Sequence, residues 1–276
     1  MQGFTLIELI LVIVILGIVS ISVSGIIRST INVVADVSER ENLVREGSFV
    51  VERLSRELNS AVPNSVRITA NASSHCIEFV PLKWSTTYLS LPLAAETNTT
   101  ADVVELLDID DNTFVPSTSD WGIVYPTQAS EVYDASLNHR QGVDSCSDDG
   151  DGNCATNDDS DGVVQVTFAD GFNASSPSKR IYFADQAISY CMRNNEIYRH
   201  TSTINTTQTL YTGGGQLMAQ NLVNVLGANT SSGEQNPFQI VDASLQRGAL
   251  TSLLLIFGRE DEHVTFMQEV QIPNVP

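Results

Sequence analysis

Basic residues are scarce in this 276-residue chain. It has 14 Lys and Arg residues against 33 Asp and Glu residues, which gives a formal net charge of −19 at pH 7. Residues 1–60 carry seven acids and five arginines, so a charge of −17 falls on residues 61–276. A field of this sign repels nucleic acid and anionic lipid headgroups. We therefore expect no direct contact between this chain and nucleic acid.

Charged residues are missing altogether from Leu9 to Ile27, a run of 19 residues. As a helix rising about 1.5 Å per residue, such a run roughly spans the ~30 Å hydrocarbon core of a bilayer. A cleaved secretory signal has a charged region, then a shorter apolar stretch and a small-residue cleavage site, and this run follows a different order. The sequence therefore predicts a helix that lies in a membrane or in an equally apolar environment.

Motifs typical of enzymes are also missing. The sequence has no nucleophile motif, phosphate-binding loop or dinucleotide fingerprint. The four histidines are scattered over the chain, at His75, His139, His200 and His263. Asp108, Asp110 and Asp111 form a carboxylate cluster that we interpret as a solvated turn. We expect neither an enzymatic activity nor a cofactor.

Cysteines are few, and all four follow the apolar run, at Cys76, Cys146, Cys154 and Cys191. Their spacing contains no C-x2-C pair, which argues against a zinc site. An even number of cysteines in a polar region favours two disulfides formed in an oxidising compartment. Three pairings are open in principle. We favour Cys146 with Cys154, which closes a short polar loop, and Cys76 with Cys191, which joins two predicted strands.

An acidic segment runs from Asp144 to Asp161, with seven acids and no Lys or Arg. Oxygen ligands at alternate positions suit Ca²⁺, and Asn157, Asp159 and Asp161 fit the start of a calcium-binding loop. At the twelfth position of that loop, Phe168 stands where a bidentate Glu closes such a site. A solvated loop closed by a disulfide is the favoured interpretation, with calcium binding as the alternative.

The helical pattern continues beyond the apolar run. Apolar residues recur near 3.6-residue spacing from Ile27 to Leu58, which predicts an amphipathic helix to about Ser60. Acid-first pairs four residues apart support it, namely Asp36–Arg40, Glu41–Arg45 and Glu52–Arg56. Pro63 marks its end. The expected rod has an apolar half, 4–27, and an amphipathic half, 28–62, that needs a domain to cover one stripe.

Residues 63–276 are expected to form a β-rich globular domain. Short runs rich in β-branched and aromatic residues alternate with clusters of Gly, Asn, Asp, Ser and Pro. The expected strands are 65–69, 76–82, 103–107, 122–125, 163–168, 180–183, 188–191, 196–199, 253–257 and 264–272. We predict an antiparallel sheet with long loops. A hairpin is expected at Asn194 and Asn195, because Asn tolerates positive φ.

The first residues carry the most specific signal. Glu8 is a single acid beside a long uncharged helix, where a carboxylate is costly without a partner. The run Gly3-Phe4-Thr5-Leu6-Ile7-Glu8, followed by an apolar stretch, resembles the N-terminal signature of type IV prepilins and type II secretion pseudopilins. The resemblance implies that residues 1–3 are a leader and that a prepilin peptidase cuts between Gly3 and Phe4. It further implies that Phe4 is N-methylated and that Glu8 pairs with the Phe4 amine of a neighbouring subunit.

A looser resemblance covers the domain. The segment from Arg180 to Arg199 and the run from Cys76 to Pro81 are similar to large minor pilins of the PilW or PulJ type and of the MSHA pilus. The implied fold is α+β and type IV pilin-like, with the long N-terminal helix packed on a mainly antiparallel β-rich domain. The implied function is that of a minor pilin at or near the pilus tip, which primes or supports assembly and has adhesion as a further role.

Such a minor pilin is expected first in the bacterial inner membrane, with its C-terminal domain in the periplasm, and later in an extracellular pilus. Its expected partners are the prepilin peptidase, the inner-membrane assembly platform, the major pilin and other minor pilins. Two alternatives stay open. One is a type II secretion pseudopilin, and the other is a membrane-tethered binding domain that never polymerises.

Overall fold

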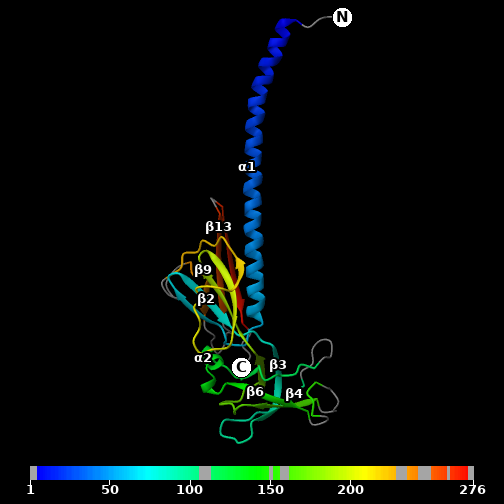
Figure 1. Ribbon diagram of the computed structural model, residues 1–276, viewed down its shortest axis with the longest axis vertical. Coiled ribbons are helices and arrows are strands. Elements are labelled where there is room, and N and C mark those ends of the chain that lie inside the picture. Colours follow the sequence, from blue (N-terminus) through cyan, green and yellow to red (C-terminus); the bar gives the residue numbers. More distant parts are fainter. Residues whose placement is uncertain are drawn as a thin grey trace.

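A single long helix and a β-rich body make up the protein (Figure 1). The computed structural model describes residues 5–105, 113–148, 152–155, 162–227, 235–241, 250–259 and 262–272. Helix α1 spans Leu6–Asn59, 54 residues in one piece. All strand pairs between the named strands are antiparallel in the described part of the chain. The predicted α+β fold with a long N-terminal helix is confirmed.

Helix α1 has two halves with different surroundings. From residue 5 to residue 38, every described side chain is exposed, because the β-rich body does not reach this part of the helix. Farther along, Leu43, Val50, Leu54 and Leu58 recur at helical spacing and are buried against the body. The helix ends before Pro63, the first proline of the chain.

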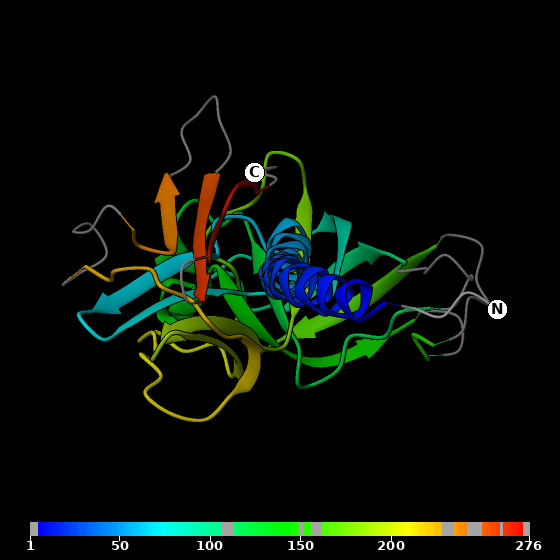
Figure 2. The ribbon, with the colours of Figure 1, turned by 90° about the horizontal axis from the view of Figure 1, so that it is seen from above.

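Two antiparallel sheets cover the buried stripe of α1. The first has the order β1-β2-β9-β10-β11 and the second the order β12-β13-β14. Their bounds are β1 Arg67–Asn71, β2 Ser74–Phe79, β9 Ala187–Arg193, β10 Glu196–Ser202, β11 Gln216–Ala219, β12 Phe238–Val241, β13 Leu250–Arg259 and β14 Glu262–Gln271. Apolar side chains from both sheets and from α1 share one core. Seen along the helix, the red strands of the second sheet lie beside α1 (Figure 2).

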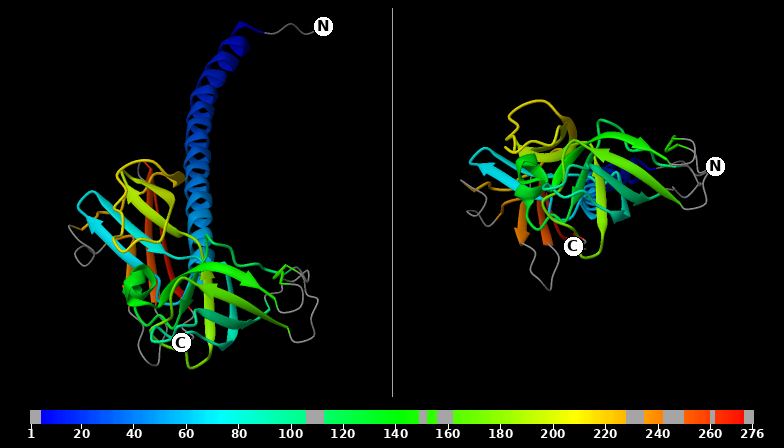
Figure 3. Two further views of the ribbon diagram at one scale, coloured as in Figure 1. Left: turned by 60° about the horizontal axis from the view of Figure 1, so that its bottom comes forward. Right: turned by 90° about the horizontal axis from the view of Figure 1, so that it is seen from below.

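A closed six-stranded barrel is inserted between β2 and β9. Its strands are β3 Trp84–Ser90, β4 Thr100–Val104, β5 Trp121–Val124, β6 Arg140–Ser147, β7 Val163–Phe168 and β8 Arg180–Ala184. They pair in the order β3-β4-β7-β6-β5-β8, and β8 closes the ring by pairing with β3. Short helices α2, Ala129–Tyr133, and η1, Ala135–Leu137, connect β5 to β6. The barrel lies at the end of the molecule away from the free half of α1 (Figures 1 and 3).

The predicted β-rich, mainly antiparallel domain is confirmed, but its division into two sheets and a barrel was not predicted. Within the described residues, segments that the sequence analysis assigned to loops contain four strands, β3, β6, β11 and β12. Strand β6 shows why it escaped detection: it opens with Arg140, Gln141 and Gly142, and the two polar side chains are buried in spite of their polarity. Polar residues at buried positions hide the alternation by which a half-buried strand is recognised.

The predicted hairpin between β9 and β10 is confirmed. Residues Arg193 and Glu196 close it, and the two residues between them are Asn194 and Asn195, with φ angles of 49° and 64°. Positive φ at both central residues is the requirement of the tight turn that suits the twist of paired strands, and Asn meets it at low cost. This turn fixes the register of β9, on which Cys191 lies.

Candidate functional site

The N-terminal end of α1 is the candidate functional site. Thr5 precedes the first helical residue, and its backbone N–H and its hydroxyl both donate to Glu8 Oε2, each at 2.9 Å. The Glu8 carboxylate thus closes the first turn of the helix, where free N–H groups and the helix dipole favour a negative charge. The other two residues of the predicted processing site, Gly3 and Phe4, lie outside the described residues.

The first half of α1 is apolar and uncovered. An 18-residue window of this helix has a mean hydropathy of 3.0, and none of it is buried within the protein. By length and composition it is the one helix in the described part of the chain that is able to cross a membrane. Exposed side chains such as Leu6, Ile13 and Ile21, between 60% and 77% exposed, need an apolar partner outside this chain.

Three hydroxyl groups in the exposed part of α1 form hydrogen bonds inside the helix. The hydroxyls of Ser20, Ser24 and Thr30 each donate to the carbonyl four residues earlier, at 2.7 to 2.9 Å. In an apolar environment there is no water to accept these hydrogen bonds, so an internal acceptor removes the cost of burying the hydroxyl. The free half of α1 therefore suits a bilayer or the interior of a helical bundle.

Ion pairs fix the second half of α1 to the body. Arg40 pairs with Glu262 of β14 at 3.4 Å, and Glu57 accepts from Arg199 of β10 at 3.1 Å. The expected pairs Glu41–Arg45 and Glu52–Arg56 form within the helix, at 2.5 and 2.6 Å. The expected Asp36–Arg40 pair does not form in the structure, because the Arg40 guanidinium reaches the carboxylate of the neighbouring strand instead.

Two disulfides stabilise the body. Cys76 and Cys191 are direct cross-strand partners on β2 and β9, and their sulfurs are bonded. Cys146, at the end of β6, is bonded to Cys154, eight residues later. These are the two pairs favoured from the sequence. The first bonds segments on either side of the barrel insertion, since the barrel lies between β2 and β9.

The predicted metal ligands Asn157, Asp159 and Asp161 lie outside the described residues, as do Asp108, Asp110 and Asp111. Within the described ranges, no group of three or more His, Cys, Asp or Glu residues is arranged to hold a metal ion. The histidines are also dispersed there, and none faces a Ser or Cys nucleophile in the described hydrogen bonds.

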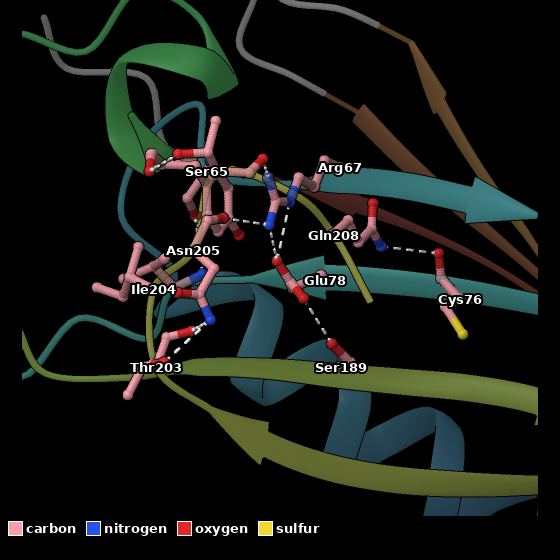
Figure 4. Close-up of polar contacts among 12 residues, drawn as sticks. Ser65, Arg67, Cys76, Glu78, Ser189, Thr203, Ile204, Asn205 and Gln208 are labelled. Carbon is pink, nitrogen blue, oxygen red and sulfur yellow. Dashed lines mark hydrogen bonds and ion pairs between the residues drawn. The ribbon is translucent and has the colours of Figure 1, made fainter. Parts of the chain in front are cut away.

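An arginine clamp, which the sequence analysis missed, joins the barrel to the first sheet, and Figure 4 shows the contacts of Arg67. We define it as Arg67 of β1 and Arg140 of β6, which bind the same loop after β10. Arg67 donates to the carbonyls of Asn205 and Thr206, both at 2.7 Å, and Arg140 donates to the carbonyl of Ile204 at 3.1 Å. Burial lowers the pKa of the Arg140 guanidinium to about 10.

Glu78 of β2 neutralises one side of this clamp. Its Oε1 accepts from Arg67 Nε at 2.8 Å, and its Oε2 accepts from the Ser189 hydroxyl at 2.9 Å. The Arg67 guanidinium also lies 3.4 Å from the centre of the Tyr133 ring. Arg67 and Glu78 are cross-strand partners in the β1–β2 hairpin. The opposite charges of these two residues could have predicted the contact. They do so only when the register of the two strands is known, because the register decides which residues face each other.

Comparisons with known proteins bear on the N-terminus. The sequence pattern of the prokaryotic N-terminal methylation motif matches residues 1–24. In this N-terminal segment the chain is type IV prepilin-like. The matched segment contains Gly3, Phe4, Glu8 and most of the apolar half of α1, so the motif and the exposed helix overlap. No curated protein and no solved structure matches the chain. The motif thus indicates a structural protein of the pilin or pseudopilin type, anchored by its N-terminal helix.

Proposed function

We propose that this chain is a minor type IV pilin that is cut between Gly3 and Phe4 and N-methylated on Phe4. The observation that carries the proposal is the coincidence of the methylation motif with an apolar half-helix that the protein's own body leaves uncovered. In the membrane, lipid covers this half. After extraction into a filament, the apolar helices of neighbouring subunits cover it.

Glu8 acts in this proposal as the charge partner of the mature N-terminus. Cleavage before Phe4 creates a positive α-amine close to a carboxylate that is already oriented by Thr5. Opposite charges attract strongly in an apolar filament core, and a carboxylate left without its partner there costs several kcal/mol. The Phe4 amine of one subunit and Glu8 of the next would therefore set the register between subunits.

The size and shape of the body support a minor role near the tip. The inserted barrel lies at the end of the molecule opposite the free half of α1 (Figure 1). A body of two sheets plus a barrel would crowd a lattice in which it is repeated at every subunit, whereas a tip position leaves the barrel unobstructed. The segment 84–184 carries 17 acids and three basic residues, so we propose that it faces solvent and not nucleic acid.

The MSHA pilus is the proposed assembly, on the resemblance of the segment from Arg180 to Arg199 and of the run from Cys76 to Pro81. The proposed partners are the prepilin peptidase, the inner-membrane platform, the major pilin and other minor pilins. The proposed location is the inner membrane with the body in the periplasm, and then the pilus.

Intact-mass and N-terminal peptide analysis tests the proposal, on protein from native membranes and from sheared surface filaments. We expect a methylated Phe4 terminus in both fractions and only a small amount in filaments. Methylated protein that is retained by a secretion complex and absent from pili would instead identify a pseudopilin. An uncut Met1 terminus found only in membranes would contradict both, and would leave a tethered binding domain.

A further inference from the structure

The outer edge of β14 is a long strand edge without a partner in the described structure. β14 is the last strand of the β12-β13-β14 sheet and pairs with β13 alone. On the far side of β13, Leu254 donates to Pro237, and Ile256 accepts from Val223. Hydrogen bonding alternates along an antiparallel strand, so the odd-numbered residues of β13 bond to β14, where their partners are the even-numbered residues. The odd-numbered residues of β14 therefore direct their backbone N–H and C=O groups outward, away from the sheet.

Apart from the charge of Glu269, these outward positions carry no protection of the usual kind. They are His263, Thr265, Met267, Glu269 and Gln271, and all are exposed. Natural edge strands are normally shortened, bulged, or blocked by charged side chains or proline, since free strand edges pair with other chains. β14 is ten residues long, its pairing with β13 is regular, and it contains neither lysine nor proline. Met267, near the middle of β14, is 73% exposed.

A groove runs beside this edge, between β14 and α1. The two elements run in the same direction, and their contacts include the Arg40–Glu262 ion pair and the packing of Gly47 against Phe266. Beyond Gly47 they leave a groove of about 510 Å³, lined by Ser48, Val51, Glu52, Ser55, Arg56, Asn59, Phe266 and Gln268. A strand added to the edge of β14 would direct alternate side chains into this groove.

The lining defines the kind of strand that fits. Ser48, Val51 and Ser55 are small or apolar, Phe266 offers an apolar ring, and Asn59 and Gln268 are polar and uncharged. The two charged side chains at the groove, Glu52 and Arg56, neutralise each other at 2.6 Å. The groove therefore favours an extended segment with uncharged, small or apolar residues at every second position.

We propose that the edge of β14 binds an extended strand of a different subunit of the filament, by strand addition. This inference rests on the proposed function, because the partner is a neighbouring pilin. A second copy of this chain fits less well. Two copies anchored in one membrane hold β14 in the same direction, since β14 runs along α1, so their edges could meet only as a parallel pair, which is slightly less stable per residue.

Hydrogen exchange tests the inference on the wild-type chain, with detergent-solubilised protein compared with sheared filaments. We expect the amides of Thr265, Met267 and Glu269 to exchange at least about tenfold more slowly in filaments. If the chain is present in filaments but its amides exchange there as fast as in detergent, strand addition is wrong and the proposed pilin function is unaffected. Absence of the chain from filaments overturns both. Protection already present in detergent at high protein concentration overturns the proposal in favour of a second copy.

A matched pair of variants separates the backbone from the side chain. Met267→Pro removes the outward N–H, and proline is tolerated at edge positions whose N–H faces away from the sheet. Met267→Ala removes a similar amount of side chain but keeps the N–H. We expect the filament-bound fraction to fall about tenfold for the proline variant and to stay unchanged for the alanine variant. Equal incorporation of both variants, or equal loss of both, contradicts the inference. If the proline variant does not fold, the hydrogen-exchange measurement on the wild-type chain is the test.

Discussion

Gly47 of α1 lies directly against the ring of Phe266 of β14, so close that a Cβ atom at position 47 would overlap the ring. The Phe266 ring also packs edge-on against Phe257 of β13, at 5.7 Å between centroids. The absence of a side chain at Gly47 is thus what allows α1 and the second sheet to meet. Helix and sheet are in contact here because one residue is small and the other is large.

Gly47→Ala should therefore destabilise the body by about 1–3 kcal/mol, in spite of the higher helix propensity of alanine, because overpacking forces the Phe266 ring away. Denaturant unfolding of the full chain in detergent measures the effect. Phe266→Leu should relieve the overlap, so that the double variant is more stable than the sum of the single effects.

Gly25→Ala is the matched control for this substitution. Nothing lies within 4 Å of the Cβ position at Gly25, which belongs to the exposed half of the same helix. We expect no change in the unfolding of the body. An equal loss at both positions would show that backbone effects, and not the contact with Phe266, dominate.

Local signals made part of this fold predictable. The apolar run and the periodic stripe predicted α1, and Pro63 predicted its end within a few residues. Asn194 and Asn195 predicted the β9–β10 hairpin through their tolerance of positive φ. In each case the physical cause lies within a few residues of its effect, so a single sequence contains it.

The barrel and the buried clamp were not predictable for the opposite reason. Trp84 pairs with Phe183 to close the barrel, and the two are separated by most of the inserted segment. Nothing in the sequence next to Arg67 identifies its acidic partner, because only the β1–β2 register places Glu78 opposite it. The Arg40–Glu262 pair likewise replaced a local partner by a distant one. Where several partners are chemically equivalent, tertiary packing decides among them.

Removing the charge of Glu78 should be strongly destabilising. The side chains of Arg67 and Glu78 are 15% and 3% exposed, and loss of one partner leaves the other charge buried and uncompensated. We expect Glu78→Gln to lower the free energy of unfolding by about 3–5 kcal/mol. Glu52→Gln is the control, since the Glu52–Arg56 pair is exposed and should contribute less than about 1 kcal/mol. Similar losses in the two variants would argue against a structural role for the clamp.

His75 should make the body sensitive to mild acid. Its ring is fully buried beside Phe238, without a hydrogen-bond partner among the described residues, and burial lowers its pKa from 6.5 to about 4. The unfolded chain therefore binds a proton below pH 6.5, whereas the folded chain does so only near pH 4. Stability contributed by neutral His75 is complete above pH 6.5 and is lost as the pH falls towards 4.

Between pH 7 and pH 5 this linkage should remove about 2 kcal/mol of stability. Unfolding curves at the two pH values measure it. His75→Leu should flatten the dependence by about that amount, while His263→Gln, at an exposed position, should leave it unchanged. A pH dependence that persists undiminished in His75→Leu would assign the effect to other groups.

The two disulfides should contribute unequally. Cys76 and Cys191 are 115 residues apart and Cys146 and Cys154 are eight apart, and loop-closure entropy grows with the number of residues enclosed. Replacing both cysteines of the first pair by alanine should cost about 5 kcal/mol, against about 2.5 kcal/mol for the second pair. Thermal unfolding of the two double variants compares them directly. Equal losses would mean that the unfolded chain is restrained by other structure.

Glu8→Gln isolates the charge of Glu8 from its local role. A glutamine oxygen still accepts from Thr5, so the first turn of α1 keeps its closure, whereas the negative charge that would face the Phe4 amine of a neighbour is gone. We expect a chain that is cut and folded normally but at least about tenfold depleted from sheared filaments, because an α-amine buried without its counter-ion is costly. Glu41→Gln, which removes an exposed charge from the same helix, should be incorporated like the wild type. Normal incorporation of Glu8→Gln would show that subunit register is set by the apolar surface of α1 and not by a charge pair.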